Sequence, residues 1–117
     1  MKFYKTLAAT AASVVIATGA MAADIVIIGG MNSDQFWNKI KKGVDDARLV
    51  VEANGGSVDY LRMQSYDNFA ADAAEIIRVA ISKNPDGLAV PNWVYDSQDE
   101  PIREIGRASC RERVYCE

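Results

Sequence analysis

The spacing of hydrophobic residues along the chain alternates between the patterns typical of β-strands and of α-helices. Residues 25–28 are a continuous β-branched run closed by two glycines, typical of a central strand that is buried on both faces. Residues 57–63 alternate apolar and polar positions, which predicts a second strand nearer the edge of the sheet. Residues 88–90 form a short third apolar run between a turn-forming segment and a proline, and they predict a third strand.

Two segments with helical periodicity separate these strands. Residues 34–53 carry one apolar stripe, and an asparagine followed by two glycines ends the helix. The members of that stripe are Phe36, Ile40, Val44, Ala47 and Val51. A second helix, capped by Asp67 or Asn68, has its own buried stripe. That stripe comprises Ala70, Ala73, Ala74, Ile77, Ala80 and Ile81.

A third helix is expected to begin between Asp96 and Asp99, with Pro101 in its first turn. Helical crossovers between consecutive strands force those strands to be parallel, and the crossovers are nearly always right-handed. The sequence therefore predicts an α/β fold, a parallel doubly wound sheet of the βαβαβ type with strand order 2-1-3.

The first 22 residues have the features of a secretory signal. Lys2 and Lys5 precede an uncharged stretch at residues 7–20, and Ala20 and Ala22 frame a small-x-small cleavage pattern. The stretch is too short and too rich in alanine and threonine for a membrane-spanning helix. We therefore expect cleavage near Ala22 and export of the mature protein to the periplasm.

The last 14 residues depart from the strand–helix pattern. Beyond Arg103 the apolar periodicity stops, and arginines gather beside the two cysteines, Cys110 and Cys116. Residues 105–114 resemble the in-frame translation of a common sequencing adapter over ten consecutive positions. We expect residues 104–117 to be a non-native tail and residues 23–103 to be the domain's own sequence. The alternative is a natural basic terminus with a cysteine pair.

Charge and composition exclude several classes of function. The 117-residue chain has a net charge of −3 and no histidine, and it is long enough for one domain. Residues 23–103 contain eight basic and thirteen acidic residues and no cysteine. The lack of a basic stripe argues against nucleic acid. The lack of histidine excludes Ser-His-Asp and Cys-His catalytic groups and histidine-ligated metals. We expect no metal and no cofactor.

Candidate ligand-binding residues follow the first and third predicted strands. In open parallel sheets, ligands bind in the crevice beyond the carboxyl ends of the strands. The candidates are Asn32, Ser33, Asp34, Gln35, Phe36, Trp37, Asn92 and Trp93. Flat aromatic faces beside amides and carboxylates suit a carbohydrate, since rings stack on its C–H face and polar groups bind its hydroxyls. Two alternatives stay open: Phe36 also begins a core stripe, and Asp34 also suits a helix cap.

Four segments carry a resemblance to a known family. They are IVII at residues 25–28, DQFW at residues 34–37, KKGVDDA at residues 41–47 and NPDGL at residues 84–88. Together they resemble the amino-terminal part of the ribose/galactose-type periplasmic sugar-binding proteins of ABC transporters, the type I periplasmic binding proteins. The resemblance covers residues 23–103 and implies that they form the first half of lobe 1 of a two-lobe protein. Gln35 departs from the family, in which many members have proline at this position.

The resemblance also implies roles for the candidate residues. Phe36 and Trp37 would stack on the sugar, residues 32–35 would contact hydroxyls, and Asn92 and Trp93 would face the cleft. The implied protein is not an enzyme. It would deliver a monosaccharide or related small polar solute to an ABC permease in the inner membrane, by cleft binding and hinge closure, and could also present it to a chemoreceptor.

Residues 1–117 alone would be inactive in solute delivery, because the second lobe of the implied protein supplies about half of the binding groups. One alternative is an exported α/β enzyme whose catalytic lobe lies elsewhere. The other is the ligand-sensing domain of a receptor. Against an enzyme, no third glycine completes a G-x-G-x-x-G motif after Gly29 and Gly30, and no G-x-S-x-G motif occurs.

The nature of the tail can be tested at the level of the gene. We expect adapter-free long-read sequencing across the codon for Arg103 to depart from the printed sequence and to continue through further strand–helix units. A genomic frame that encodes residues 105–117 and then stops would contradict the adapter interpretation.

Overall fold

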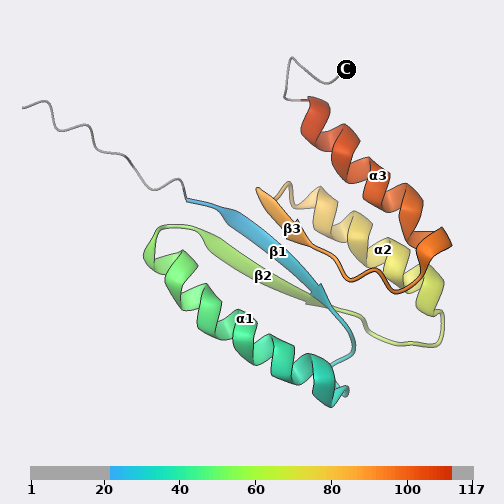
Figure 1. Cartoon of the computed structure of the whole chain (residues 1–117), viewed down its shortest axis with the longest axis horizontal. Coiled ribbons are helices and arrows are strands. Elements are labelled where there is room, and N and C mark those ends of the chain that lie inside the picture. The colour runs from blue at the N-terminus through green and yellow to red at the C-terminus, as the bar shows by residue number, and fades with distance from the viewer. Residues whose placement is uncertain (1–21, 112–117) are drawn as a thin grey trace, which may run out of the picture.

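A computed structural model describes residues 22–111 as a three-layer α/β arrangement (Figure 1). The elements are β1 (Asp24–Gly29), α1 (Gln35–Ala53), β2 (Ser57–Arg62), α2 (Phe69–Ser82), β3 (Gly87–Ala89) and α3 (Tyr95–Arg111). The predicted signal segment, apart from its last residue, lies outside the described residues, as do residues 112–117. No helix in the described part of the chain has the length and apolarity needed to cross a membrane.

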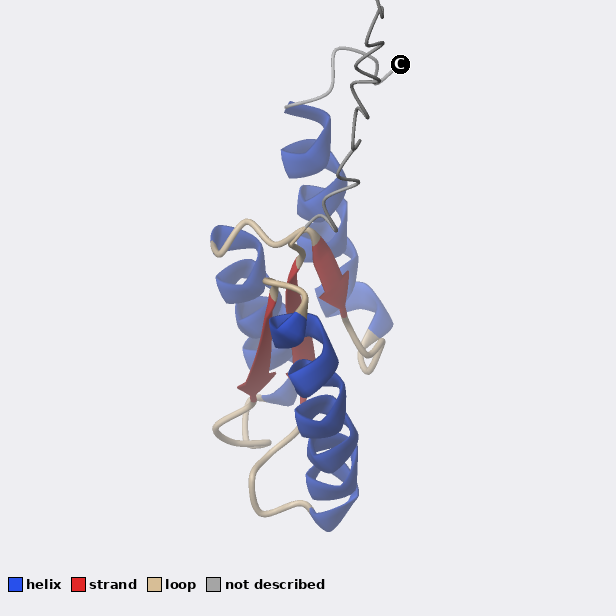
Figure 2. Cartoon of the chain, turned by 90° about the vertical axis from the view of Figure 1, so that its left-hand side faces the viewer, coloured by secondary structure: helices blue, strands red, loops and turns tan. Residues whose placement is uncertain are grey.

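The three strands form one parallel sheet in the order β2-β1-β3, which confirms the predicted fold class and strand order. β1 pairs with β2 along its whole length, from Asp24 opposite Ser57 to Gly29 opposite Arg62. β3 pairs with the middle of β1. The crossover from β1 to β2 and the crossover from β2 to β3 run in opposite directions along the sheet. α1 therefore covers one face of the sheet while α2 and α3 lie on the other (Figures 1 and 2).

The main core lies between β1 and α2. Val26 and Ile28 of β1 are buried against Ile77 and Ala80 of α2. Small alanines on α2 let the helix approach the sheet closely, and most of the predicted stripe of α2 is buried; Ala70 is exposed. The apolar pattern therefore identified the packed face of α2 correctly except near its first turn.

The predicted stripe of α1 is wrong at two positions. Val44 is buried and Ile40 and Val51 are partly buried, but Ala47 is exposed and Phe36 is 62% exposed. A helix of 19 residues is about 28 Å long, whereas a strand of six residues spans about 20 Å. The first turn of α1 therefore extends past the sheet, and Phe36 does not contribute to the core.

α3 also begins earlier than predicted, at Tyr95, so that Pro101 lies in its second turn and is buried. A fully buried glutamine, Gln98, fixes this start. Its Oε1 accepts hydrogen bonds from the backbone N–H groups of Trp93 and Val94, both at 2.7 Å. Its Nε2 donates to the carbonyl oxygen of Pro91 at 3.0 Å. One side chain thus holds the whole β3–α3 loop.

α3 continues across the expected domain boundary after residue 103 without a change of secondary structure. Ile105 packs against the main core, and Glu104 lies 3.4 Å from the Arg78 guanidinium of α2. The tail assignment remains a prediction, since these contacts do not bear on the origin of residues 104–117.

Gln98 provides a test of this fold. Gln98→Leu keeps the volume but leaves two buried N–H groups without an acceptor, and we expect a loss of about 2 kcal/mol in the free energy of unfolding. The matched control is Gln64→Leu, which changes an exposed glutamine and should have little effect. Urea denaturation measures both variants, and equal stabilities would contradict the role assigned to Gln98.

Candidate functional site

Five aromatic side chains meet where the strands end, and we call them the aromatic cluster. They are Phe36, Trp37, Trp93, Phe69 and Tyr66. Neighbouring ring centroids in this order are 5.2, 5.3, 5.6 and 5.4 Å apart. Three of the four pairs are edge-to-face, a favourable geometry for aromatic rings. The cluster therefore joins the segments after β1, β2 and β3. Phe36 and Tyr66 are exposed, whereas the other three rings are half-buried and Trp93 also packs against the main core.

Two members of the cluster were missed from the sequence. Trp37 and Trp93 were candidates and lie in direct contact. Tyr66 and Phe69 come from the segment after β2, for which the sequence predicts only a helix cap at Asp67 or Asn68. Aromatic residues that flank an Asp-Asn pair directly after a parallel strand were the available signal. Asn68 occupies the cap position of α2 without a side-chain cap hydrogen bond.

Asp34 links the start of α1 to the segment after β2. Its Oδ1 accepts a hydrogen bond from the backbone N–H of Phe36 at 2.9 Å, which confirms the predicted helix cap. Its Oδ2 accepts a hydrogen bond from the Tyr66 hydroxyl at 3.1 Å. The same hydroxyl oxygen accepts from the N–H of Met31 at 3.0 Å. Both carboxylate oxygens are thus engaged in fixing Phe36 and Tyr66.

Arg62, at the end of β2, holds the segment between β1 and α1 from the other side. Its guanidinium donates to the carbonyl oxygen of Gly30 at 2.6 Å and to the carbonyl oxygen of Met31. A third hydrogen bond, of 3.0 Å, goes to the Asn38 side chain, which in turn donates to the carbonyl oxygen of Asn32. Arg62 therefore positions the loop, since its donors on all three nitrogens are used within the protein.

Tyr60 of β2 forms a hydrogen bond with the backbone of Trp37. Its hydroxyl donates to the backbone carbonyl oxygen of Trp37 at 3.3 Å, and the Arg62 guanidinium lies 5.4 Å from its ring centroid. Burial raises the pKa of the Tyr60 phenol above its usual value, further from the neutral range in which the hydroxyl already donates.

Gly29 and Gly30 make this arrangement possible. A Cβ atom at Gly29 would lie well inside 3.0 Å of the Tyr60 ring, and one at Gly30 would collide with Trp37 and the Tyr66 hydroxyl. From the sequence, both glycines end a strand and do not belong to a G-x-G-x-x-G motif, and neither observation predicts this close packing. They are required because three aromatic side chains approach the backbone at this point.

The remaining candidate residues surround the cluster without packing into it. Asn32, Ser33, Gln35 and Asn92 are exposed. Within the described part of the chain their side chains form no hydrogen bond, so their amide and hydroxyl groups are available to a ligand. These four residues flank Phe36, Trp37 and Trp93 along the chain, and we call them the neutral polar border.

The loops at the carboxyl ends of the three strands carry a net negative charge. The segments 30–37, 63–68 and 90–96 contain Asp34, Asp67 and Asp96 but no lysine or arginine. Among residues 22–106, whose side chains are described, no three histidine, cysteine or acidic side chains gather in a way that could hold a metal ion. The nearest cation is Arg62, whose guanidinium is hydrogen-bonded to the backbone of Gly30 and Met31 and to the Asn38 side chain. The arrangement can therefore contact an uncharged ligand through ring faces and neutral polar groups, while the nearby carboxylates disfavour an anion.

The chain matches no family model, no curated protein and no solved structure.

Two glycine substitutions test the packing of the cluster. Gly30→Ala forces Trp37 and Tyr66 to move, and we expect a loss of about 1–3 kcal/mol in stability. Gly43→Ala, the control, adds a methyl group in open space within α1 and should stabilise the helix by about 1 kcal/mol. Thermal unfolding followed by near-ultraviolet circular dichroism measures both. An unchanged tryptophan spectrum and stability in Gly30→Ala would contradict the close approach.

Proposed function

We propose that this chain is the amino-terminal part of a periplasmic solute-binding protein that delivers a monosaccharide or related small polar solute to an ABC importer. The observation that carries the proposal is the aromatic cluster, in which rings from three separate strand ends are in contact beside the neutral polar border. The resemblance of residues 23–103 to the ribose/galactose-type binding proteins supports the same function.

The chemistry of the border favours an uncharged, hydroxylated ligand. A sugar ring has an apolar C–H face that can lie on the exposed ring of Phe36, and its hydroxyls can pair with Asn32, Gln35 and Asn92. Phosphate or carboxylate groups would meet Asp34 and no cation from the three segments. The site therefore binds a neutral sugar or polyol in preference to a sugar phosphate or sugar acid.

The proposed mechanism is binding without chemical conversion. The aromatic cluster supplies one wall of the cleft, and a second lobe supplies the opposite wall when the hinge closes. A permease in the inner membrane, and a chemoreceptor where one is present, would recognise the closed form. The amino-terminal signal would bring the protein to the periplasm.

Two exposed aromatic residues allow a direct test of the proposal. Contacts with the rings of Phe36 and Trp37, at about 1.4 kcal/mol each, would give a Kd on the order of 10 mM, far weaker than transport requires. Saturation-transfer NMR detects binding in this range. With D-ribose, D-galactose or myo-inositol as probes, we expect signals from at least one probe, reduced about fivefold or more in Phe36→Ala (an estimate from the loss of one ring contact).

The control variant is Tyr95→Ala. Tyr95 is 77% exposed and belongs to α3, and its ring is not part of the aromatic cluster. The Tyr95→Ala variant should give the same sugar signal as the unchanged chain. Glucose 6-phosphate should give no saturation-transfer signal with either protein. A sugar signal that survives Phe36→Ala unchanged would contradict the proposal.

A further inference from the structure

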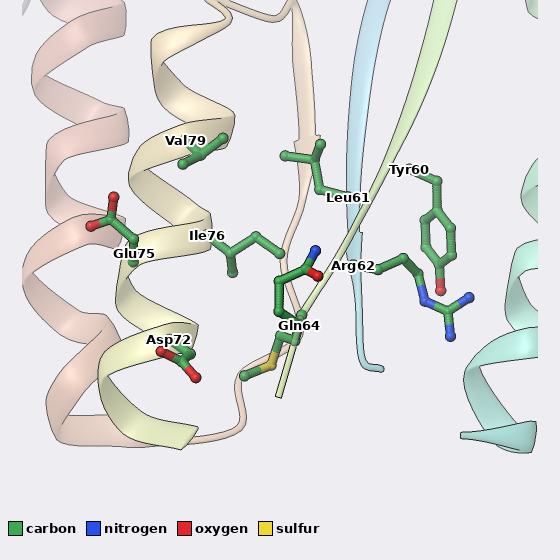
Figure 3. A pocket seen from close by; sticks show the side chains of 9 residues that line it. Tyr60, Leu61, Arg62, Gln64, Asp72, Glu75, Ile76 and Val79 are labelled. Atoms are coloured by element: carbon green, nitrogen blue, oxygen red, sulfur yellow. The ribbon is translucent and has the colours of Figure 1, made fainter. Parts of the chain in front are cut away.

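A groove of about 510 Å³ lies between β2 and α2, separate from the aromatic cluster. Its floor is apolar and consists of Leu61, Met63, Ile76 and Val79. Figure 3 shows Leu61 directed toward Ile76 across the groove, while the side chains of Tyr60 and Arg62 lie on the opposite side of the strand. The groove is therefore bounded by a helix on one side and by the backbone of β2 on the other.

The outer edge of β2 carries open hydrogen-bonding groups. In the described part of the chain β2 pairs only with β1, and the N–H groups of Ser57 and Met63 donate to β1 or to the residue before it. In a parallel strand, the N–H and C=O groups of one residue point to the same side, and those of the next residue point to the opposite side. The N–H and C=O groups of Val58, Tyr60 and Arg62 therefore face away from β1.

The contact of Arg48 agrees with this direction. Its Nε donates to the carbonyl oxygen of Val58 at 3.0 Å, which closes the edge at that residue. The peptide groups of Tyr60 and Arg62 remain open beside the groove. An unpaired edge of this kind is a template for an additional strand.

The helix side of the groove is acidic. Asp72 and Glu75 line it from α2, three residues apart, and neither forms an ion pair with another described residue. The nearest basic residues along α2 are engaged elsewhere, Arg78 with Glu104 and Lys83 with Asp59. Two unpaired carboxylates thus border an apolar floor and favour a basic occupant.

We propose that the β2 edge and this groove bind an extended basic segment of a partner protein, which adds to the sheet as a further strand. Its backbone would pair with the peptide groups of Tyr60 and Arg62, as in other strand-addition complexes. Alternate side chains would lie on the apolar floor, and a lysine or arginine among them would reach Asp72 and Glu75. A second copy of this acidic chain lacks that complementary charge.

The test uses the full chain and a defined peptide. The probe is the acetylated, amidated peptide Val-Thr-Lys-Thr-Val-Thr-Lys-Thr, in which the valines and lysines share one face of an extended strand. It is titrated into ¹⁵N-labelled protein. We expect shifts of the backbone amide signals of β2 and of the groove-facing residues of α2. A peptide N-methylated at every second residue, on the side that faces β2, should bind about tenfold more weakly or worse, because it cannot form the strand hydrogen bonds.

Charge is tested with matched double variants. Asp72→Asn with Glu75→Gln should weaken binding of the probe peptide about tenfold at low salt. Asp46→Asn with Glu52→Gln removes the same charge from exposed positions of α1 and should leave affinity unchanged. Equal weakening by both double variants, equal binding of the same peptide with glutamate in place of lysine, or shifts confined to the free edge of β3 would overturn the proposal. Self-association through β2 without peptide would overturn the choice of partner.

Discussion

The close approach of three aromatic side chains to the end of β1 is the constraint on which the rest of this structure depends. β1 is the central strand, so the chain that leaves it passes directly between the segments that follow β2 and β3. Only glycine can occupy positions 29 and 30 there, because Tyr60, Trp37 and Tyr66 fill the space of a side chain. The route of this short segment decides where α1 begins and therefore where Phe36 and Trp37 lie.

Polar side chains that bind backbone groups hold this arrangement in place. Arg62 secures the segment after β1, Asp34 joins that segment to Tyr66, and Gln98 secures the segment after β3. The hydrogen bonds of each side chain fix the position of a loop. The proposed contacts with a ligand are therefore left to the aromatic rings. A fixed set of rings loses less conformational entropy on binding than a mobile one.

The sequence predicted the fold more completely than the site. Strand identity and order follow from the runs of apolar residues and from the helical crossovers, and both signals are local and strong. The exposure of Phe36 could not be predicted, because periodicity does not show where a helix extends past its sheet. Gln98 was missed because a glutamine within a polar helix is usually exposed. The hydrogen bonds that join Tyr66 to Met31 and Asp34 link residues far apart in sequence, which periodicity does not reveal.

The most direct measurement of the central claim is an NMR titration of the two tryptophan indole N–H signals with a monosaccharide. The chain contains only two tryptophans, Trp37 and Trp93, and both belong to the aromatic cluster. If the cluster is the wall of a sugar site, the indole signal of Trp37 shifts together with the side-chain amide signals of Asn32 and Asn92. If these signals stay fixed while a sugar binds elsewhere on the chain, the cluster is only a packing feature and the account is wrong.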